Sequence, residues 1–177
     1  MIMHQQTLSS LLRAPCGAPF FLFLARLLLV CGLLSVLKAS AADDVETRQI
    51  VDIDFPTARE ALVESIELEG LKIREIIPFN QMLERTASGL GKAGSPFVNV
   101  EIVQFCSSPL SWQMLEEDAS QMALCPLSIV LYMKRAEPGR VTLAWRLPGQ
   151  TTAGRRGAEN LLRKLAERAV EIGQRRR

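Results

Sequence analysis

The chain has 177 residues, of which 48 % are hydrophobic and 23 % are charged, a composition typical of one globular domain and not of a disordered chain. Its formal net charge of +2 combines segments of opposite charge. Residues 43–153 are acidic, with 10 Lys and Arg against 16 Asp and Glu, and residues 154–177 are basic, with 8 Lys and Arg against 3 Asp and Glu. From residue 43 onward the net charge is only −1. This balance gives no electrostatic basis for a nucleic-acid partner.

Residues 1–42 are predicted to be a signal peptide that is cleaved on export. This segment contains no acid, Arg26 precedes an apolar run at 27–37, and small residues then favour cleavage after Ala41 or Ala42. A membrane anchor is the alternative, but Arg26 interrupts a stretch that would need about 20 apolar residues to span a bilayer. We therefore expect a periplasmic or extracellular protein that touches the membrane only through this transient segment, and a membrane-anchored one if the leader is retained.

The rest of the chain shows alternating strand and helix patterns without internal repeats. In chain order, the predicted elements are a strand at 49–54, a helix at 56–69, a strand at 71–77, a short helix at 80–86, a glycine-rich loop at 88–96, a strand at 97–105, a short helix at 109–118, a strand at 127–133, a strand at 141–147, a linker at 149–154 and a helix at 158–172.

Apolar periodicity supports these assignments and suggests how the elements pack. Ala58, Leu62 and Ile66 share one face of the first long helix. Residues 127–133 are almost wholly apolar, which predicts a central strand covered on both faces. The last two strands are joined by a tight turn at 137–140 and must be antiparallel.

Without the short helices, the order of elements is β-α-β-β-β-β-α. One sheet with two long helices on one face buries the apolar faces of all these elements. The sequence therefore predicts an α+β fold, in which an antiparallel β-sheet of about five strands carries two long helices on one face.

Three segments resemble the domain-of-unknown-function 302 family: Val103-Gln-Phe-Cys-Ser-Ser-Pro109, Met114-Leu-Glu-Glu-Asp118 and Ala123-Leu-Cys-Pro-Leu-Ser-Ile-Val-Leu-Tyr132. The resemblance covers about residues 48–147, and its Cys-Pro order departs from the family's Pro-Cys. It implies an α+β fold like that of the TATA-binding protein, often dimeric, with antiparallel strands on either side of the two cysteines. The family has no established biochemical function, so the resemblance implies no reaction.

Two cysteines, Cys106 and Cys125, follow the predicted cleavage site. In the antiparallel arrangement that the resemblance implies, they lie at the same end of the sheet, where their Cα atoms could approach the roughly 5.5–6 Å of a disulfide. Three interpretations stay open. An oxidising compartment favours a structural disulfide, free cysteines are often simply buried, and a redox or thiolate–metal site would also use this pair.

Catalytic residue types are scarce. The single histidine, His4, lies in the predicted leader, so the exported chain has no histidine as general base or metal ligand. Glu116, Glu117 and Asp118 are consecutive on a helix and point in different directions, which favours a solvated helix end over a cation site. We therefore predict no catalytic residue, no metal site and no cofactor.

Residues 154–177 form a basic amphipathic helix and tail, set apart from a domain at 43–153. We predict that this helix packs on the domain, with Glu159 and Arg163 paired at i, i+4 and its basic end opposite the helix dipole. Contact of its cations with anionic lipid or an acidic partner is the alternative.

The leading functional hypothesis is a non-enzymatic, exported binding or assembly module. It could be a homodimer, and its small ligand or protein partner is unknown. One alternative is a thiol-dependent redox or metal-binding protein that uses Cys106 and Cys125. The other is a carrier of an apolar small ligand, because a sheet gripped by helices can leave a cavity.

Overall fold

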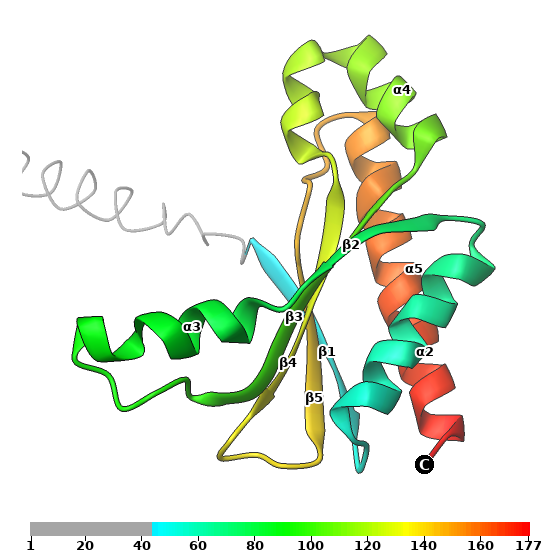
Figure 1. Ribbon diagram of the computed structural model, residues 1–177. Helices are drawn as coiled ribbons and strands as arrows, with labels where there is room; N and C mark the ends of the chain where they lie inside the picture. The colour runs from blue at the N-terminus through cyan, green and yellow to red at the C-terminus, as the bar shows by residue number, and fades with distance from the viewer. Residues whose placement is uncertain (1–43) are drawn as a thin grey trace, which may run out of the picture. The chain divides into compact units, whose positions relative to one another are not determined.

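A five-stranded sheet with helices on one face forms the fold in the computed structural model, which describes residues 44–177 (Figure 1). The predicted leader and its cleavage site at Ala41 or Ala42 lie outside these residues. Within residues 44–177, no helix has the length and apolar character needed to cross a membrane.

The elements follow the predicted order, with small shifts at their ends. They are β1 (Val45–Val51), α2 (Phe55–Leu68), β2 (Lys72–Ile77), α3 (Phe79–Ala87), the 3₁₀ helix η1 (Ser88–Leu90), β3 (Phe97–Cys106), α4 (Ser108–Glu117), the 3₁₀ helix η2 (Ala119–Leu124), β4 (Leu127–Lys134), β5 (Arg140–Arg146) and α5 (Ala153–Arg175).

The strands form one sheet in the order β1-β5-β4-β3-β2, and all neighbouring pairs are antiparallel. Helices α2 and α5 cover one face of the sheet, whereas α3 extends away from it (Figure 1). The predicted α+β fold is therefore confirmed. Strands β3 and β4 pair with Phe105 opposite Leu127, in the antiparallel arrangement that the family resemblance implied.

Helices α2 and α5 lie side by side and run in opposite directions. The buried Ser65 hydroxyl of α2 donates to the Leu165 carbonyl of α5 over 2.8 Å. Acids of α2 also pair with the cations of α5: Glu69 with Lys164 and Arg168, and Glu60 and Glu64 with Arg176. The basic final helix is thus packed on the domain, with several of its charges matched by those of α2.

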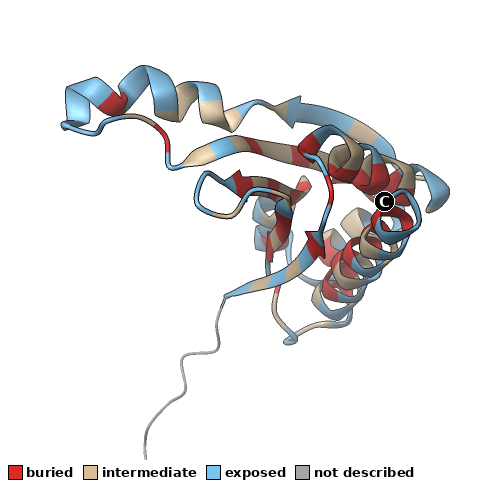
Figure 2. Ribbon diagram, turned by 90° about the horizontal axis from the view of Figure 1, so that it is seen from below, coloured by how far each residue is buried: buried red, intermediate tan, exposed pale blue. Residues whose placement is uncertain are grey.

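One apolar core fills the space between the helices and the sheet. Ala58, Leu62 and Ile66 of α2 are fully buried, as predicted. The expectation for β4 was wrong in part: its helix-facing side chains are buried, but Val130 and Tyr132 on the other face are only partly buried. In the ribbon coloured by burial, buried residues lie on the long helices and on the strands that they cover (Figure 2). Because helices cover a single face, a central place in the sheet does not bury both sides of the strand.

The first strand ends earlier than the predicted 49–54, because local polar contacts favour the next helix. Asp52 has a φ of 56°, in the left-handed region, which interrupts extended backbone. Asp54 caps α2: its carboxylate accepts hydrogen bonds from the backbone N–H and the hydroxyl of Thr57, over 2.9 and 2.7 Å. The two aspartates thus belong to the turn and the cap.

Helix α5 begins at Ala153, inside the segment 149–154 that was predicted as a linker. Thr152 caps its first turn, and both carboxylate oxygens of Glu117 accept the Gly154 N–H, over 2.8 and 3.1 Å. The N-terminal N–H groups of a helix need such acceptors. The chain can therefore start the helix earlier than its glycines suggest.

Glycines at the start of α5 let α4 approach closely. A Cβ at Gly154 would lie 2.7 Å from the Cγ of Met114 and 2.8 Å from the Oε2 of Glu117, and one at Gly157 would lie 2.7 Å from Leu110. These distances are shorter than van der Waals contact, so the packing of α4 on α5 requires glycine there.

We expect Gly154→Ala to lower the free energy of unfolding by about 1–2 kcal/mol, measured by urea denaturation. Overpacking costs about 1–3 kcal/mol, and the better helix propensity of alanine offsets up to about 1 kcal/mol. Gly89→Ala is the matched control, because a Cβ there meets nothing within 4 Å, and it should change little. A Gly154→Ala variant as stable as the parent would contradict the packing argument.

Candidate functional site

Cys106 and Cys125 come to the same end of the sheet, but no disulfide joins them, and both thiols are free. Cys106 ends β3 directly after Phe105, which faces the core, so its exposed side chain points to the open face. Cys125 packs against the core, and its Sγ lies 3.4 Å from the Oγ of Ser111 in α4. Of the three interpretations, the structural disulfide is thus not present: the two sulfur atoms face opposite sides of the sheet.

The acidic helix end contributes no cation site. Glu117 caps α5, and Asp118 caps η2 by accepting the Ser120 N–H over 2.8 Å. Across residues 44–177, no group of three His, Cys, Asp or Glu side chains is arranged to hold a metal ion. These acids therefore serve the ends of helices.

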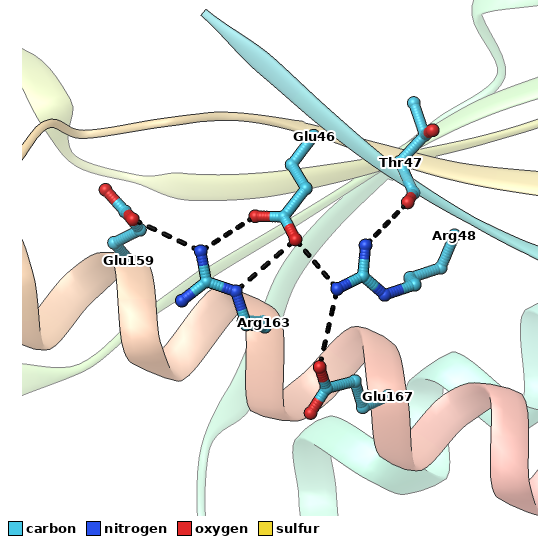
Figure 3. A network of polar contacts seen from close by, with 6 residues as sticks. All are labelled: Glu46, Thr47, Arg48, Glu159, Arg163 and Glu167. Atoms are coloured by element: carbon cyan, nitrogen blue, oxygen red, sulfur yellow. Dashed lines mark hydrogen bonds and ion pairs between the residues drawn. The ribbon is translucent and has the colours of Figure 1, made fainter.

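A network of charges ties β1 to α5 (Figure 3). Arg163 of α5 donates to Glu46 of β1 through Nε and Nη2, over 3.3 and 3.0 Å, and Nη2 also lies 3.3 Å from Glu159. Arg48 of β1 contacts Glu46 over 2.8 Å and Glu167 over 3.4 Å. The network links a strand to a helix more than 100 residues away in the chain.

Hydrogen bonding in this network stabilises the charged forms. The hydrogen bond from Arg163 lowers the pKa of Glu46, although burial of the carboxyl acts in the opposite direction. The same hydrogen bond raises the pKa of Arg163. Both groups are ionised near neutral pH, so the network is a tether between elements and offers neither a general acid nor a general base.

The tether borders Trp145 of β5, a residue that is 2 % exposed and faces the helices. Trp145 pairs with Glu46 across the β1–β5 ladder. The guanidinium carbon of Arg48 lies 5.7 Å from the centre of the indole ring, within the range of a cation–π contact. The network therefore fixes one side of the Trp145 ring.

The ladder between β4 and β5 stops short beside Trp145. Its last paired residues are Val130 and Ala144. Beyond that point β4 stays paired with β3 as far as Leu127, and β5 stays paired with β1 as far as Arg146. The second and third strands of the sheet thus diverge while each keeps its outer neighbour.

A cavity of about 400 Å³ lies at this divergence. Its wall is mostly apolar and comes from β1, η2, β4, β5 and α5; it includes Val45, Leu124, Pro126, Val130, Trp145 and Leu162. Among residues 44–177, Arg146 is the only charged residue that lines it. The volume falls within the roughly 300–1,000 Å³ of small-molecule sites.

Trp145, one of the residues that line this cavity, carries an unused hydrogen-bond donor. Its Nε1 is buried, and no acceptor within residues 44–177 lies at hydrogen-bond distance. A buried donor without a partner costs about 1–3 kcal/mol, and most buried polar groups in folded proteins are paired. The donor beside the cavity is therefore the feature of the structure that most clearly points to a ligand.

A second hollow, of about 580 Å³, lies beside α3, but its chemistry is different. It is lined by polar and charged residues, and Glu101 in its wall has a buried Oε2 without a hydrogen-bond partner. The other oxygen of Glu101 already faces Arg59 over 3.5 Å. This hollow lacks the apolar wall that the cavity at Trp145 provides.

Reactive residue types direct attention to the cysteines and leave Trp145 unmarked. Trp145 lies between Ala144 and Arg146 in the strand predicted at 141–147, a position that indicates only a core side chain. The missing ladder beside it depends on β1 and β3, which are distant in the chain. No local signal marked this site.

We expect Glu46→Gln to lower the free energy of unfolding by about 1 kcal/mol at pH 7, because the variant loses its charge in the tether. The folded state lowers the pKa of Glu46, so this stability is present above the usual glutamate pKa of about 4.3 and is lost as the pH falls. In urea unfolding, the difference from the parent should shrink by pH 3. Glu171→Gln, at an exposed position of α5, is the control and should have little effect at either pH. A Glu46→Gln effect of equal size at pH 7 and pH 3 would contradict the ionic origin.

Residues 47–175 match the family described as "Domain of unknown function DUF302", a range that includes α5. The crystal structure of an uncharacterized conserved protein DUF302 from Bacillus stearothermophilus is similar, with a TM-score of 0.53 and 18 % sequence identity over 77 % of this chain and 100 % of that chain. At this identity the likeness shows the fold alone. No curated protein matches the chain. With the match covering most of its length, from β1 through the basic final helix, the chain belongs to the DUF302 family.

Proposed function

We propose that the protein is an exported, non-enzymatic binding module that holds a small, mostly apolar molecule in the cavity between β4 and β5. The observation that carries the proposal is the divergence of these two strands beside the unpartnered donor of Trp145. The proposal joins the binding module predicted from the sequence with its apolar-carrier alternative.

The position of the gap supports a ligand. Strands at the edge of a sheet commonly lose their partners, but β4 and β5 are the third and second strands of five. Backbone N–H and C=O groups are strong hydrogen-bonding groups, and burying them unpaired is costly. A gap between the ends of two inner strands, lined mostly by apolar residues, is a feature that a bound molecule would explain.

The residue types in residues 44–177 favour binding over catalysis. There is no histidine among them, and the two thiols lie on opposite sides of the sheet. The hydrogen bond between Arg163 and Glu46 lowers the pKa of the carboxyl and raises that of the guanidinium, so this pair stays ionised. No observation favours the thiol-dependent alternative over binding in the cavity.

Export is supported by the leader sequence, whose cleavage after Ala41 or Ala42 gives a mature chain that begins at Ala42 or Asp43. We expect the intact mass of protein recovered outside the cytoplasm to start at one of these residues. Alkylation before mass measurement, without reductant, should label both remaining thiols, and the exposed Cys106 faster than Cys125. A mass that includes the leader would contradict cleavage, and labelling only after reduction would reveal a disulfide.

Binding in the cavity can be tested with N-phenyl-1-naphthylamine, a neutral apolar probe whose fluorescence rises in apolar sites. We expect saturable binding to the parent and about tenfold weaker binding to Ala123→Phe, which places a ring at an exposed position of the cavity wall. Ala119→Phe is the matched control, because Ala119 is exposed on the same 3₁₀ helix but does not line the cavity. Equal binding to both variants, or no binding to the parent, would overturn this function.

A further inference from the structure

We infer that the molecule held in the cavity carries an uncharged acceptor oxygen of the carbonyl type, which accepts a hydrogen bond from Nε1 of Trp145. The inference rests on the proposed function of the cavity as a small-molecule site. It adds the chemical class of the ligand and the residue that selects it.

The indole dictates an acceptor on the ligand. The nitrogen of tryptophan is a donor only, and that of Trp145 is buried without a partner. A purely apolar ligand would leave this donor unpaired, so it would not recover the cost of burying it. A ligand with an acceptor oxygen would satisfy the donor and still bury its apolar part against Val130, Leu124 and Leu162.

The charges near the cavity argue for a neutral acceptor. Burying a carboxylate against a single N–H is unfavourable unless a cation accompanies it. Arg48, which lies over the Trp145 ring, is already paired with Glu46 and Glu167. Arg146 lines the cavity, but it follows Trp145 directly in β5, so its side chain points to the open face of the sheet, as that of Val130 does. Of the described cations that line the cavity or cover the Trp145 ring, none is therefore unpaired on the helix side of the sheet, where the indole lies.

The acceptor reaches Nε1 only when the cavity wall gives way slightly, because this nitrogen is covered in the structure. The gap makes such a movement feasible, since β4 and β5 are not paired with each other beyond Val130 and Ala144. Binding should therefore change the surroundings of the Trp145 indole directly.

The first test follows the indole N–H signals of the ¹⁵N-labelled mature protein. The chain has two tryptophans, and Trp112 is 64 % exposed on α4, so its signal is an internal control. We expect acetophenone, a neutral apolar ketone, to move the Trp145 signal to lower field in a saturable way. Ethylbenzene, which has nearly the same shape without the oxygen, should produce no such downfield shift. The Trp112 signal should stay in place with both probes.

The second test compares the same two probes on Trp145→Phe, which keeps an aromatic ring and removes the donor. We expect the dissociation constant of acetophenone to rise about fivefold more than that of ethylbenzene, as the loss of one hydrogen bond implies. Because the two probes have nearly the same shape, a change in the shape of the cavity should alter both dissociation constants alike, and their ratio reports the hydrogen bond. The spectra of the parent keep the inference testable if this variant folds poorly.

The outcomes separate the inference from the proposed function. If both probes bind but neither produces a downfield shift at Trp145, or if Trp145→Phe weakens both equally, the cavity binds molecules without using the indole, and the inference fails alone. Benzoate that binds at least as tightly as acetophenone and moves the same signal would overturn the uncharged class. If neither acetophenone, ethylbenzene nor the naphthylamine probe binds the parent, the proposed function fails with it.

Discussion

The packing of α5 is the interaction on which the rest of the structure depends. Along its length this helix contacts α4 through Gly154, β1 through Arg163 and α2 through Lys164 and Arg168. It closes the apolar core on one face of the sheet, and within residues 44–177 no helix layer covers the other face. Contacts between residues so distant in sequence carry a large entropic cost of ordering, which the buried side chains of α5 must offset.

This arrangement also gives a physical reason for the gap in the sheet. The pair β1 and β5 is tied to α5 through the charges around Glu46, whereas β4 is paired with β3 along its whole length from Leu127. Strand β5 therefore follows β1 and α5, whereas β4 follows β3. The two strands separate at the boundary between these two sets of contacts. The cavity forms at that boundary, with Leu162 of α5 in its wall. The network of Figure 3 is thus structural in its chemistry, but it positions the wall of the candidate site.

Most of the fold could be predicted because it is encoded by local periodicity. The helical spacing of Ala58, Leu62 and Ile66 and the alternation in β5 are visible in short windows of sequence, and these residues are buried as the patterns predict. The errors occurred where a distant contact decided the local structure. Gly154 looked like part of a linker, because its reason for being glycine is the side chain of Met114 in another helix. The partly exposed Val130 looked buried, because its run of apolar neighbours does not say how many faces the helices cover.

The candidate site was hidden from the sequence for the same reason. Reactive residue types drew attention to Cys106 and Cys125, which face opposite sides of the sheet, whereas Trp145 looked like an ordinary core residue. What distinguishes Trp145 is the absence of an acceptor for its nitrogen, and that property belongs to the assembled surroundings of the ring. An unsatisfied buried donor lowers the free energy of unfolding, and this free energy is small in folded proteins. Because Trp145 lines a mostly apolar cavity between the ends of two inner strands, the ligand that we propose would complete its hydrogen bond.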